Sequence, residues 1–171
     1  MSATARSLAN RGAAFEARLA YQHARYLADG HFVGRNGPPM QFIPVKGGGV
    51  RAVPVKGAKG LPDYLVVAHG LAFLVDAKEH KGDRLPYGAL PDYQAREMDR
   101  WVKQGPAFRA GLVVCLGGEV WFLPWTIGAA FAYWNWYGMP RAKPGEGSWS
   151  VDDLDTYGRR VVGVDWLAVA P

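Results

Sequence analysis

Two apolar runs separated by only two residues constrain the fold of this chain more than any other feature. The runs span residues 63–68 and 71–77, and His69-Gly70 joins them. Apolar runs of this length around a two-residue, glycine-containing loop are typical of a β-hairpin.

The 171 residues correspond to about one domain. Periodicity and turn residues predict further helices over 8–28, 91–103 and 126–137, a capped short helix starting at 150–153, and strands over 41–45, 111–116, 120–123 and 161–169. Together, the predicted helices and strands indicate one mixed α/β domain.

The predicted hairpin carries acidic residues at one end. Pairing about the two-residue loop places Asp63 opposite Asp76. Side chains alternate along a strand, so Asp76 and Lys78 point to the same face of the sheet. We therefore expect two carboxylates and one ammonium group to lie close together.

This combination of charges suggests hydrolysis of a phosphodiester. Mg²⁺ usually takes one or two carboxylates together with substrate phosphate. A lysine beside the metal can orient or deprotonate a water, and both can stabilise charge at phosphorus. A plain surface ion pair between Asp76 and Lys78, contributing about 0–1 kcal/mol, is the alternative. The conjunction of both acids with the lysine, after a helix carrying Glu16, favours catalysis.

Positive charge is concentrated in the first third of the chain. Residues 1–60 hold nine basic and two acidic residues, whereas residues 61–171 hold eleven basic and thirteen acidic ones. Such asymmetry is typical of a protein that binds a polyanion. Residues 46–60 combine five glycines and four cations, and two interpretations fit them: a flexible linker, or a projecting β-arm that meets phosphates.

Composition excludes several classes of protein. A single cysteine, Cys115, rules out an internal disulfide framework and a multi-cysteine zinc site. No apolar stretch reaches the roughly 18 residues of a membrane span. The first residues show no secretory signal. We therefore expect a cytoplasmic protein with no membrane partner.

The order of several short motifs along the chain resembles that of the PD-(D/E)xK nuclease superfamily, and within it that of the RecU-type Holliday junction resolvases. The pieces that carry the resemblance are Asn10-Arg11-Gly12 with Phe15-Glu16, residues 31–39 ending in Gly-Pro-Pro, Asp63-Tyr64, Asp76-Ala77-Lys78-Glu79, Gln94, residues 120–123 and residues 164–167.

The resemblance implies a restriction-endonuclease-like fold, with a mixed central sheet flanked by helices. It implies a single nuclease domain over 1–171 with a Gly/Lys-rich β-arm at about 45–60. It further implies a homodimer that cuts two opposed strands of a four-way DNA junction in recombination or repair, with Mg²⁺ or Mn²⁺ as cofactor and recombination proteins as further partners. Asp63 and Asp76 match the metal-binding carboxylates and Lys78 matches the catalytic lysine. Glu16 matches an acid that completes the metal site, directly or through water.

The same resemblance suggests DNA contacts. Arg11 falls on the family's Asn-Arg-Gly and is expected at a phosphate. Gln94 matches a helix residue facing the active site, and a solvated helix glutamine is the alternative. The expected DNA-binding residues are Arg11, Arg35, Lys46, Arg51, Lys56, Lys59 and Gln94.

Two departures from the family pattern affect the expected function. Asp76 stands where the resolvases usually have glutamate, and the arm segment carries no aromatic wedge. Two other functions therefore stay open: a related nuclease acting on other DNA structures, and a non-catalytic DNA-binding protein of the same fold.

Overall fold

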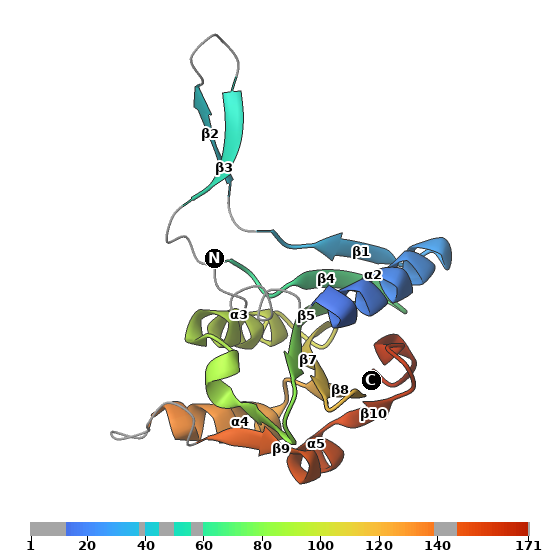
Figure 1. The fold of residues 1–171 in the computed structure, drawn as a ribbon, viewed down its shortest axis with the longest axis vertical. Coiled ribbons are helices and arrows are strands. Elements are labelled where there is room, and N and C mark those ends of the chain that lie inside the picture. The colour runs from blue at the N-terminus through green and yellow to red at the C-terminus, as the bar shows by residue number, and fades with distance from the viewer. Residues whose placement is uncertain (1–12, 38–39, 45–49, 56–59, 139–146, 171) are drawn as a thin grey trace, which may run out of the picture.

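The chain is built around a six-stranded mixed sheet (Figure 1). The computed structural model describes residues 13–37, 40–44, 50–55, 60–138 and 147–170. The strands, in spatial order, are β1 (Phe32–Arg35), β4 (Tyr64–Ala68), β5 (Leu71–His80), β7 (Phe108–Leu116), β8 (Glu119–Pro124) and β10 (Arg159–Val161). β5 and β7 run parallel, and the other neighbours are antiparallel.

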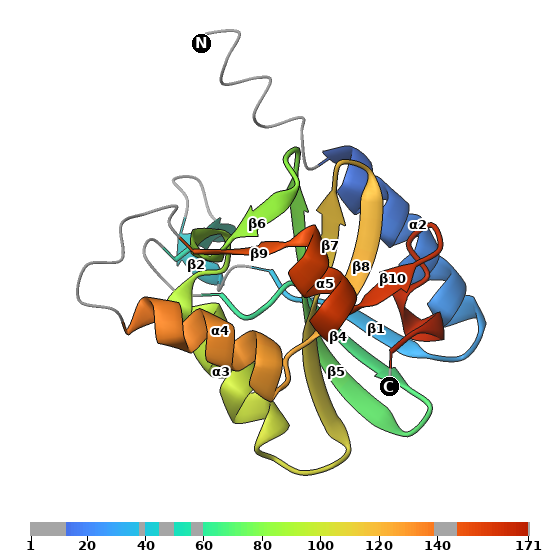
Figure 2. The same ribbon diagram turned by 90° about the horizontal axis from the view of Figure 1, so that it is seen from below.

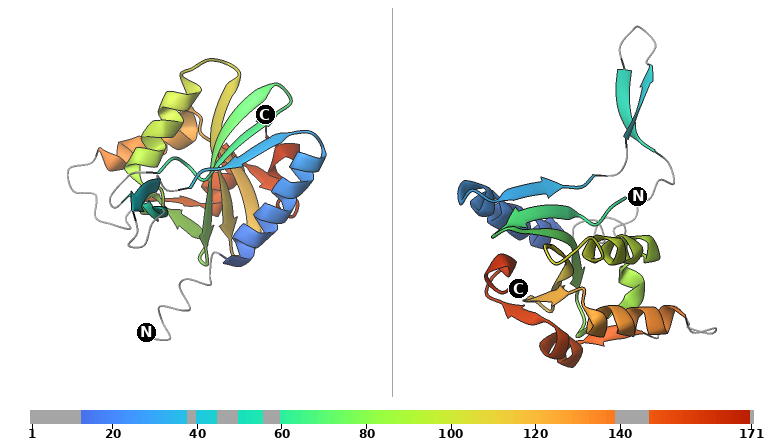
Figure 3. Two further views of the ribbon diagram at one scale, coloured as in Figure 1. Left: turned by 90° about the horizontal axis from the view of Figure 1, so that it is seen from above. Right: turned by 180° about the vertical axis from the view of Figure 1, so that it is seen from behind.

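Helices cover both faces of this sheet (Figures 2 and 3). The α-helices are α2 (Ala13–Ala28), α3 (Asp92–Val102), α4 (Ile127–Tyr137) and α5 (Val151–Tyr157), with 3₁₀ helices η1 (Tyr87–Ala89) and η2 (Trp166–Ala168). Two apolar cores result, because successive side chains of a strand point to opposite faces. Along β7, Leu112 and Val114 pack with α3 and α4, whereas Val113 and Cys115 pack with α2. Burial on both faces explains the continuous apolar run in β7.

The chain order explains the one parallel pair. In the sequence, α3 falls between β5 and β7. It packs on one face of the sheet and contributes the buried Ala95 and Met98 to the core there. A parallel pair needs such a crossover, whereas the β4–β5 and β7–β8 pairs need only tight turns. This arrangement leaves the end of β5 that carries Asp76 and Lys78 close to the start of β4.

Two short pairs of strands lie outside the main sheet. β2 (Met40–Pro44) and β3 (Val50–Pro54) form an antiparallel pair, which Figure 1 shows standing away from the six-stranded sheet. β6 (Arg84–Pro86) pairs with β9 (Ser148–Ser150). No helix within the described ranges has the length and apolar character needed to cross a membrane.

Most of the expected elements are present. The mixed α/β class, with a mixed sheet flanked by helices, is confirmed. The central hairpin has the predicted register, with Tyr64 opposite Val75. The capping box is also present: the Ser150 hydroxyl accepts a hydrogen bond from the Asp153 amide, and the Asp153 carboxylate accepts one from the Ser150 amide.

The expectation of a final strand over 161–169 was wrong. β10 ends at Val161, and the chain then turns through Gly163, which has a φ of +65°, into η2. Trp166 is fully buried against Phe73 and Phe122. Burial of a large aromatic side chain decides this segment, rather than the β propensity of its valines. The first part of the expected helix at 8–28 lies outside the described residues.

Candidate active site

Asp63 and Asp76 lie side by side where β4 begins. Tyr64 pairs with Val75, so the next positions along the two strands are 63 and 76. The Asp63 carboxylate accepts a hydrogen bond of 3.0 Å from the backbone amide of Ala77. The side chain of Asp63 therefore reaches across to β5 at the position of Asp76, as the hairpin arithmetic predicts.

Asp76 is a fully buried carboxylate, with 0% of its surface exposed. Its Oδ2 lies 2.5 Å from Nζ of Lys78, whose side chain is 17% exposed. Burial raises the pKa of Asp76 from 3.8 to about 6; the Lys78 ammonium counters this shift and the Asp63 carboxylate adds to it. Apart from the ion pair, neither oxygen of Asp76 has a hydrogen-bond partner within the part of the chain that the structure describes.

These features fit a divalent cation. A buried carboxylate without hydrogen-bond donors is unfavourable unless a charge compensates it. Hard cations such as Mg²⁺ bind one or two carboxylates and complete their shell with water or phosphate oxygens. Across the described ranges, however, no three His, Cys, Asp or Glu side chains are grouped closely enough to hold a metal ion by themselves. Asp63 and Asp76 thus offer two neighbouring carboxylates, which are fewer than the ligands that a complete metal site requires.

The third expected ligand, Glu16, has another contact. Glu16 is in the first turn of α2, and its carboxylate accepts a hydrogen bond of 3.0 Å from Arg35 at the end of β1. Both side chains are more than half exposed. Burial raises the pKa of the nearby Tyr64; Arg35 counters this shift, and Asp63, Glu16 and Asp76 add to it. The acids thus share one electrostatic neighbourhood, and a direct role of Glu16 in metal binding stays a prediction.

Gln94 lies on α3 at the edge of this site. It is buried, and its Nε2 donates a long hydrogen bond of 3.5 Å to the carbonyl of Leu61, two residues before Asp63. Its Oε1 has no hydrogen-bond partner among the described residues. Gln94 is thus not a solvated helix glutamine.

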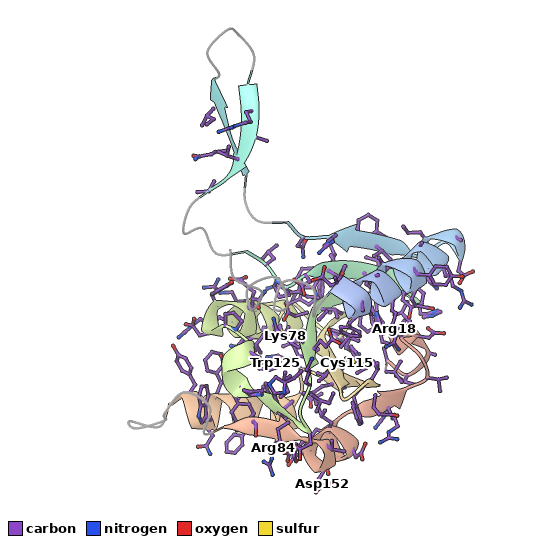
Figure 4. All side chains as sticks on the ribbon, in the orientation of Figure 1. Arg18, Lys78, Arg84, Cys115, Trp125 and Asp152 are labelled. Atoms are coloured by element: carbon purple, nitrogen blue, oxygen red, sulfur yellow. The ribbon has the colours of Figure 1, made fainter. Side chains whose placement is uncertain are left out.

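The expected DNA-binding cations are only partly described. Arg51 is exposed on β3, and Arg35 is held by Glu16. Arg11, Lys46, Lys56 and Lys59 lie outside the described residues. Figure 4 shows Lys78 in the middle of the molecule and Asp152 at a distant end, on α5.

Sequence reasoning missed one residue that contacts the site. Asn36 donates from Nδ2 to the carbonyl of Pro62 at 2.7 Å, and its backbone amide donates to the carbonyl of Asp63, also at 2.7 Å. The segment Arg-Asn-Gly indicates only a turn, because a side chain's bond to a distant backbone carbonyl leaves no local sequence signal.

No protein-family model and no curated protein matches this chain. Among solved structures, the Holliday junction resolvase Hjc of the archaeal hyperthermophile Archaeoglobus fulgidus is similar to it. The two share 15% sequence identity with a TM-score of 0.47, and the match covers 87% of this chain and 95% of that one. A similarity this weak carries no argument about function, which depends on the geometry of the site.

Proposed function

We propose that this chain is a structure-selective DNA endonuclease that resolves four-way junctions by divalent-metal-dependent hydrolysis, as a RecU-type, restriction-endonuclease-like enzyme. One observation carries the proposal: a fully buried Asp76 lies beside the second carboxylate of Asp63, and among the described residues its charge is compensated only by Lys78. A surface ion pair does not require a buried acid, so the alternative of a plain salt bridge fits this geometry poorly.

Each residue of the site has a distinct part in the proposed chemistry. Asp63 and Asp76 hold Mg²⁺ or Mn²⁺, with Glu16 as a further ligand directly or through water. The bound ion supplies positive charge against the negative charge that develops on the phosphate. Lys78 carries an ammonium group at the same place, where it orients or deprotonates the attacking water. The expected products carry 5′-phosphate and 3′-hydroxyl ends.

DNA binding is assigned to the basic first third of the chain. The net positive charge of residues 1–60 suits contacts with phosphates that do not depend on sequence. Arg51 is exposed on the β2–β3 pair, which Figure 1 shows extending away from the sheet. We assign Arg11, Arg35, Lys46, Lys56 and Lys59 to DNA binding as well, and Gln94 to the edge of the active site. A homodimer supplies the two active sites that two opposed strands require.

The test compares DNA substrates rather than variants. Purified protein is incubated with an end-labelled four-way junction, a matched linear duplex and a flap, each with Mg²⁺ and with a chelator. The proposal predicts paired cuts in opposed strands of the junction in Mg²⁺ only, with 5′-phosphate ends. Preferential cutting of the flap or the duplex would show that the preferred substrate is that DNA structure and not a four-way junction. Binding without cutting at any Mg²⁺ or Mn²⁺ concentration would reject catalysis.

A further inference from the structure

Asn36 joins two parts of the chain directly beside Asp63. β1 and β4 pair from Phe32–Val67 to Arg35–Tyr64, so residues 36 and 63 follow as the next positions. The backbone amide of Asn36 continues the ladder by donating to the Asp63 carbonyl at 2.7 Å. Its side-chain amide then donates to the preceding carbonyl, that of Pro62, also at 2.7 Å. One residue therefore holds two successive carbonyls.

The place of this double contact in the chain is informative. The chain leaves the main sheet after Asn36, forms the β2–β3 pair and returns at Pro62. Pro62 has no N–H group, so it cannot donate to a strand ladder at this point. The link between the two segments at Pro62 is made instead through its carbonyl, which accepts the hydrogen bond from the Asn36 side chain. The two ends of the segment at 37–61 are thereby fastened to each other next to a proposed metal-binding carboxylate.

Asp63 needs this support because it lies outside the regular part of the sheet. β4 begins at Tyr64, and the Asp63 carboxylate is held at its tip by the Ala77 amide. The backbone carbonyl of Asp63 accepts a hydrogen bond from the backbone amide of Asn36. The Asn36 contacts and the Ala77 contact together fix both ends of this residue, and groups that orient a metal ligand in this way raise metal affinity without touching the metal.

We infer that Asn36 is a positioning residue that holds Asp63 for the divalent cation, an inference that rests on the proposed function. It has no role in the reaction itself. Loss of its side-chain amide releases the Pro62 carbonyl and lets the Pro62-Asp63 backbone move relative to Asp76. The expected consequence is weaker metal binding, rather than a slower reaction at saturating metal.

The experiment measures Mn²⁺ binding to the DNA-free full-length chain by titration calorimetry. The variants are Asn36→Ala, Asn36→Gln, whose longer side chain cannot keep the 2.7 Å contact, and the matched control Asn135→Ala on the exposed side of α4. Both Asn36 variants are expected to bind Mn²⁺ about 10-fold more weakly than wild type, the lower end for outer-shell partners. Asn135→Ala is expected to bind as wild type does. Far-UV circular dichroism confirms folding, and Asn36→Gln carries the test if Asn36→Ala does not fold.

Cutting assays add a second readout. Excess Mn²⁺ is expected to restore cutting by Asn36→Ala but not by Asp63→Asn, since only the latter lacks a ligand. Mn²⁺ affinity in both Asn36 variants within about twofold of wild type would overturn the inference, because outer-shell effects are larger than that. If wild type binds Mn²⁺ but cuts no DNA, the proposed function fails while the positioning role is still tested. If wild type binds no Mn²⁺, the inference is also overturned.

Discussion

At the scale of single residues, the site is explained by the cost of burying a charge. A carboxylate inside a protein is strongly unfavourable without a compensating partner. Asp76 has the ammonium of Lys78 at 2.5 Å, but the second carboxylate of Asp63 works against that compensation. The arrangement leaves one negative charge in excess, which the divalent cation of the proposed function would compensate. Under that proposal, Lys78 and the cation share the Asp76 carboxylate and have separate tasks.

The separation of those tasks predicts the behaviour of Lys78→Met. Cutting of a four-way junction is expected to fall by at least about 100-fold, because the variant loses a group that acts on the attacking water. Mn²⁺ affinity, measured by calorimetry, is expected to be retained or tightened, because the variant removes a cation that competes for Asp76. Lys103→Met, on the exposed end of α3, is the matched control. Loss of Mn²⁺ binding in Lys78→Met would show that the lysine orders the ligands instead.

Metal binding is also expected to depend on pH. The pKa of Asp76 is raised to about 6, chiefly by burial, so a proton occupies this carboxylate below that pH. A cation must displace that proton, and its apparent affinity then falls by about tenfold per pH unit below pH 6, the limit for one displaced proton. Above pH 6 the affinity is expected to level off. Mn²⁺ titrations between pH 5 and pH 8 measure this, and an affinity that does not change across pH 6 would contradict the role of Asp76.

At the scale of elements, tight contacts between strands hold the site in place. Gly111 in β7 pairs with Val75, the residue before Asp76, and with Pro124 in β8. A Cβ added at Gly111 lies 2.7 Å from the ring of Phe122 and 2.9 Å from the backbone oxygen of Leu123. Because a backbone oxygen cannot easily move away, the sheet must shift if this position gains a side chain.

Gly111→Ala is therefore expected to lower the free energy of unfolding by about 1–3 kcal/mol, as overpacking typically does. Urea unfolding followed by circular dichroism measures the change. Gly88→Ala is the matched control, since a Cβ at Gly88 meets no atom within 4 Å. Equal stability of Gly111→Ala and Gly88→Ala would show that β7 and β8 can separate without cost.

The central hairpin could be predicted from sequence because its loop sets its register. His69 and Gly70 both have positive φ, +53° and +76°, which matches the twist that a two-residue hairpin loop requires. Asp63, Asp76 and Lys78 were therefore placed correctly relative to each other. The segment at 161–169 was not, because its conformation depends on the burial of Trp166 among aromatic side chains that are distant in sequence.

The contacts of the site's outer residues were also beyond sequence reasoning. Glu16 was expected near the two aspartates, but its contact with Arg35 depends on how α2 lies against β1. Gln94 and Asn36 contact backbone carbonyls of Leu61 and Pro62, which belong to a different segment. Local patterns predict elements and register, whereas such contacts depend on the packing of the complete chain.

At the scale of the whole molecule, two buried groups make opposite contributions to stability as pH changes. Burial lowers the pKa of His23 to about 4; its Nε2 accepts a hydrogen bond from Trp166. Between pH 4 and 6.5 the unfolded chain binds a proton that native His23 does not, so this group makes stability rise with pH. Asp76 keeps a proton in the native state between pH 3.8 and about 6, so it makes stability fall with pH.

Removing either Asp76 or His23 is expected to reveal the contribution of the other group to the pH dependence of the free energy of unfolding. In metal-free buffer, the free energy of unfolding of Asp76→Asn should rise with pH by roughly 2 kcal/mol more than that of wild type between pH 4 and pH 6. His23→Phe should instead lose the rise with pH that wild type owes to His23. Urea unfolding at several pH values measures both. Parallel curves for wild type and Asp76→Asn would contradict the raised pKa of Asp76.

The most direct test of the central claim is the rate at which Asp76→Asn cuts a labelled four-way junction in Mg²⁺. Asp152→Asn, at the far end of the molecule on α5, is the matched control. If Asp63 and Asp76 gather a divalent cation beside Lys78, Asp76→Asn binds the junction as wild type does and cuts none of it, while Asp152→Asn cuts at the wild-type rate. Cutting by Asp76→Asn at the wild-type rate would contradict the account.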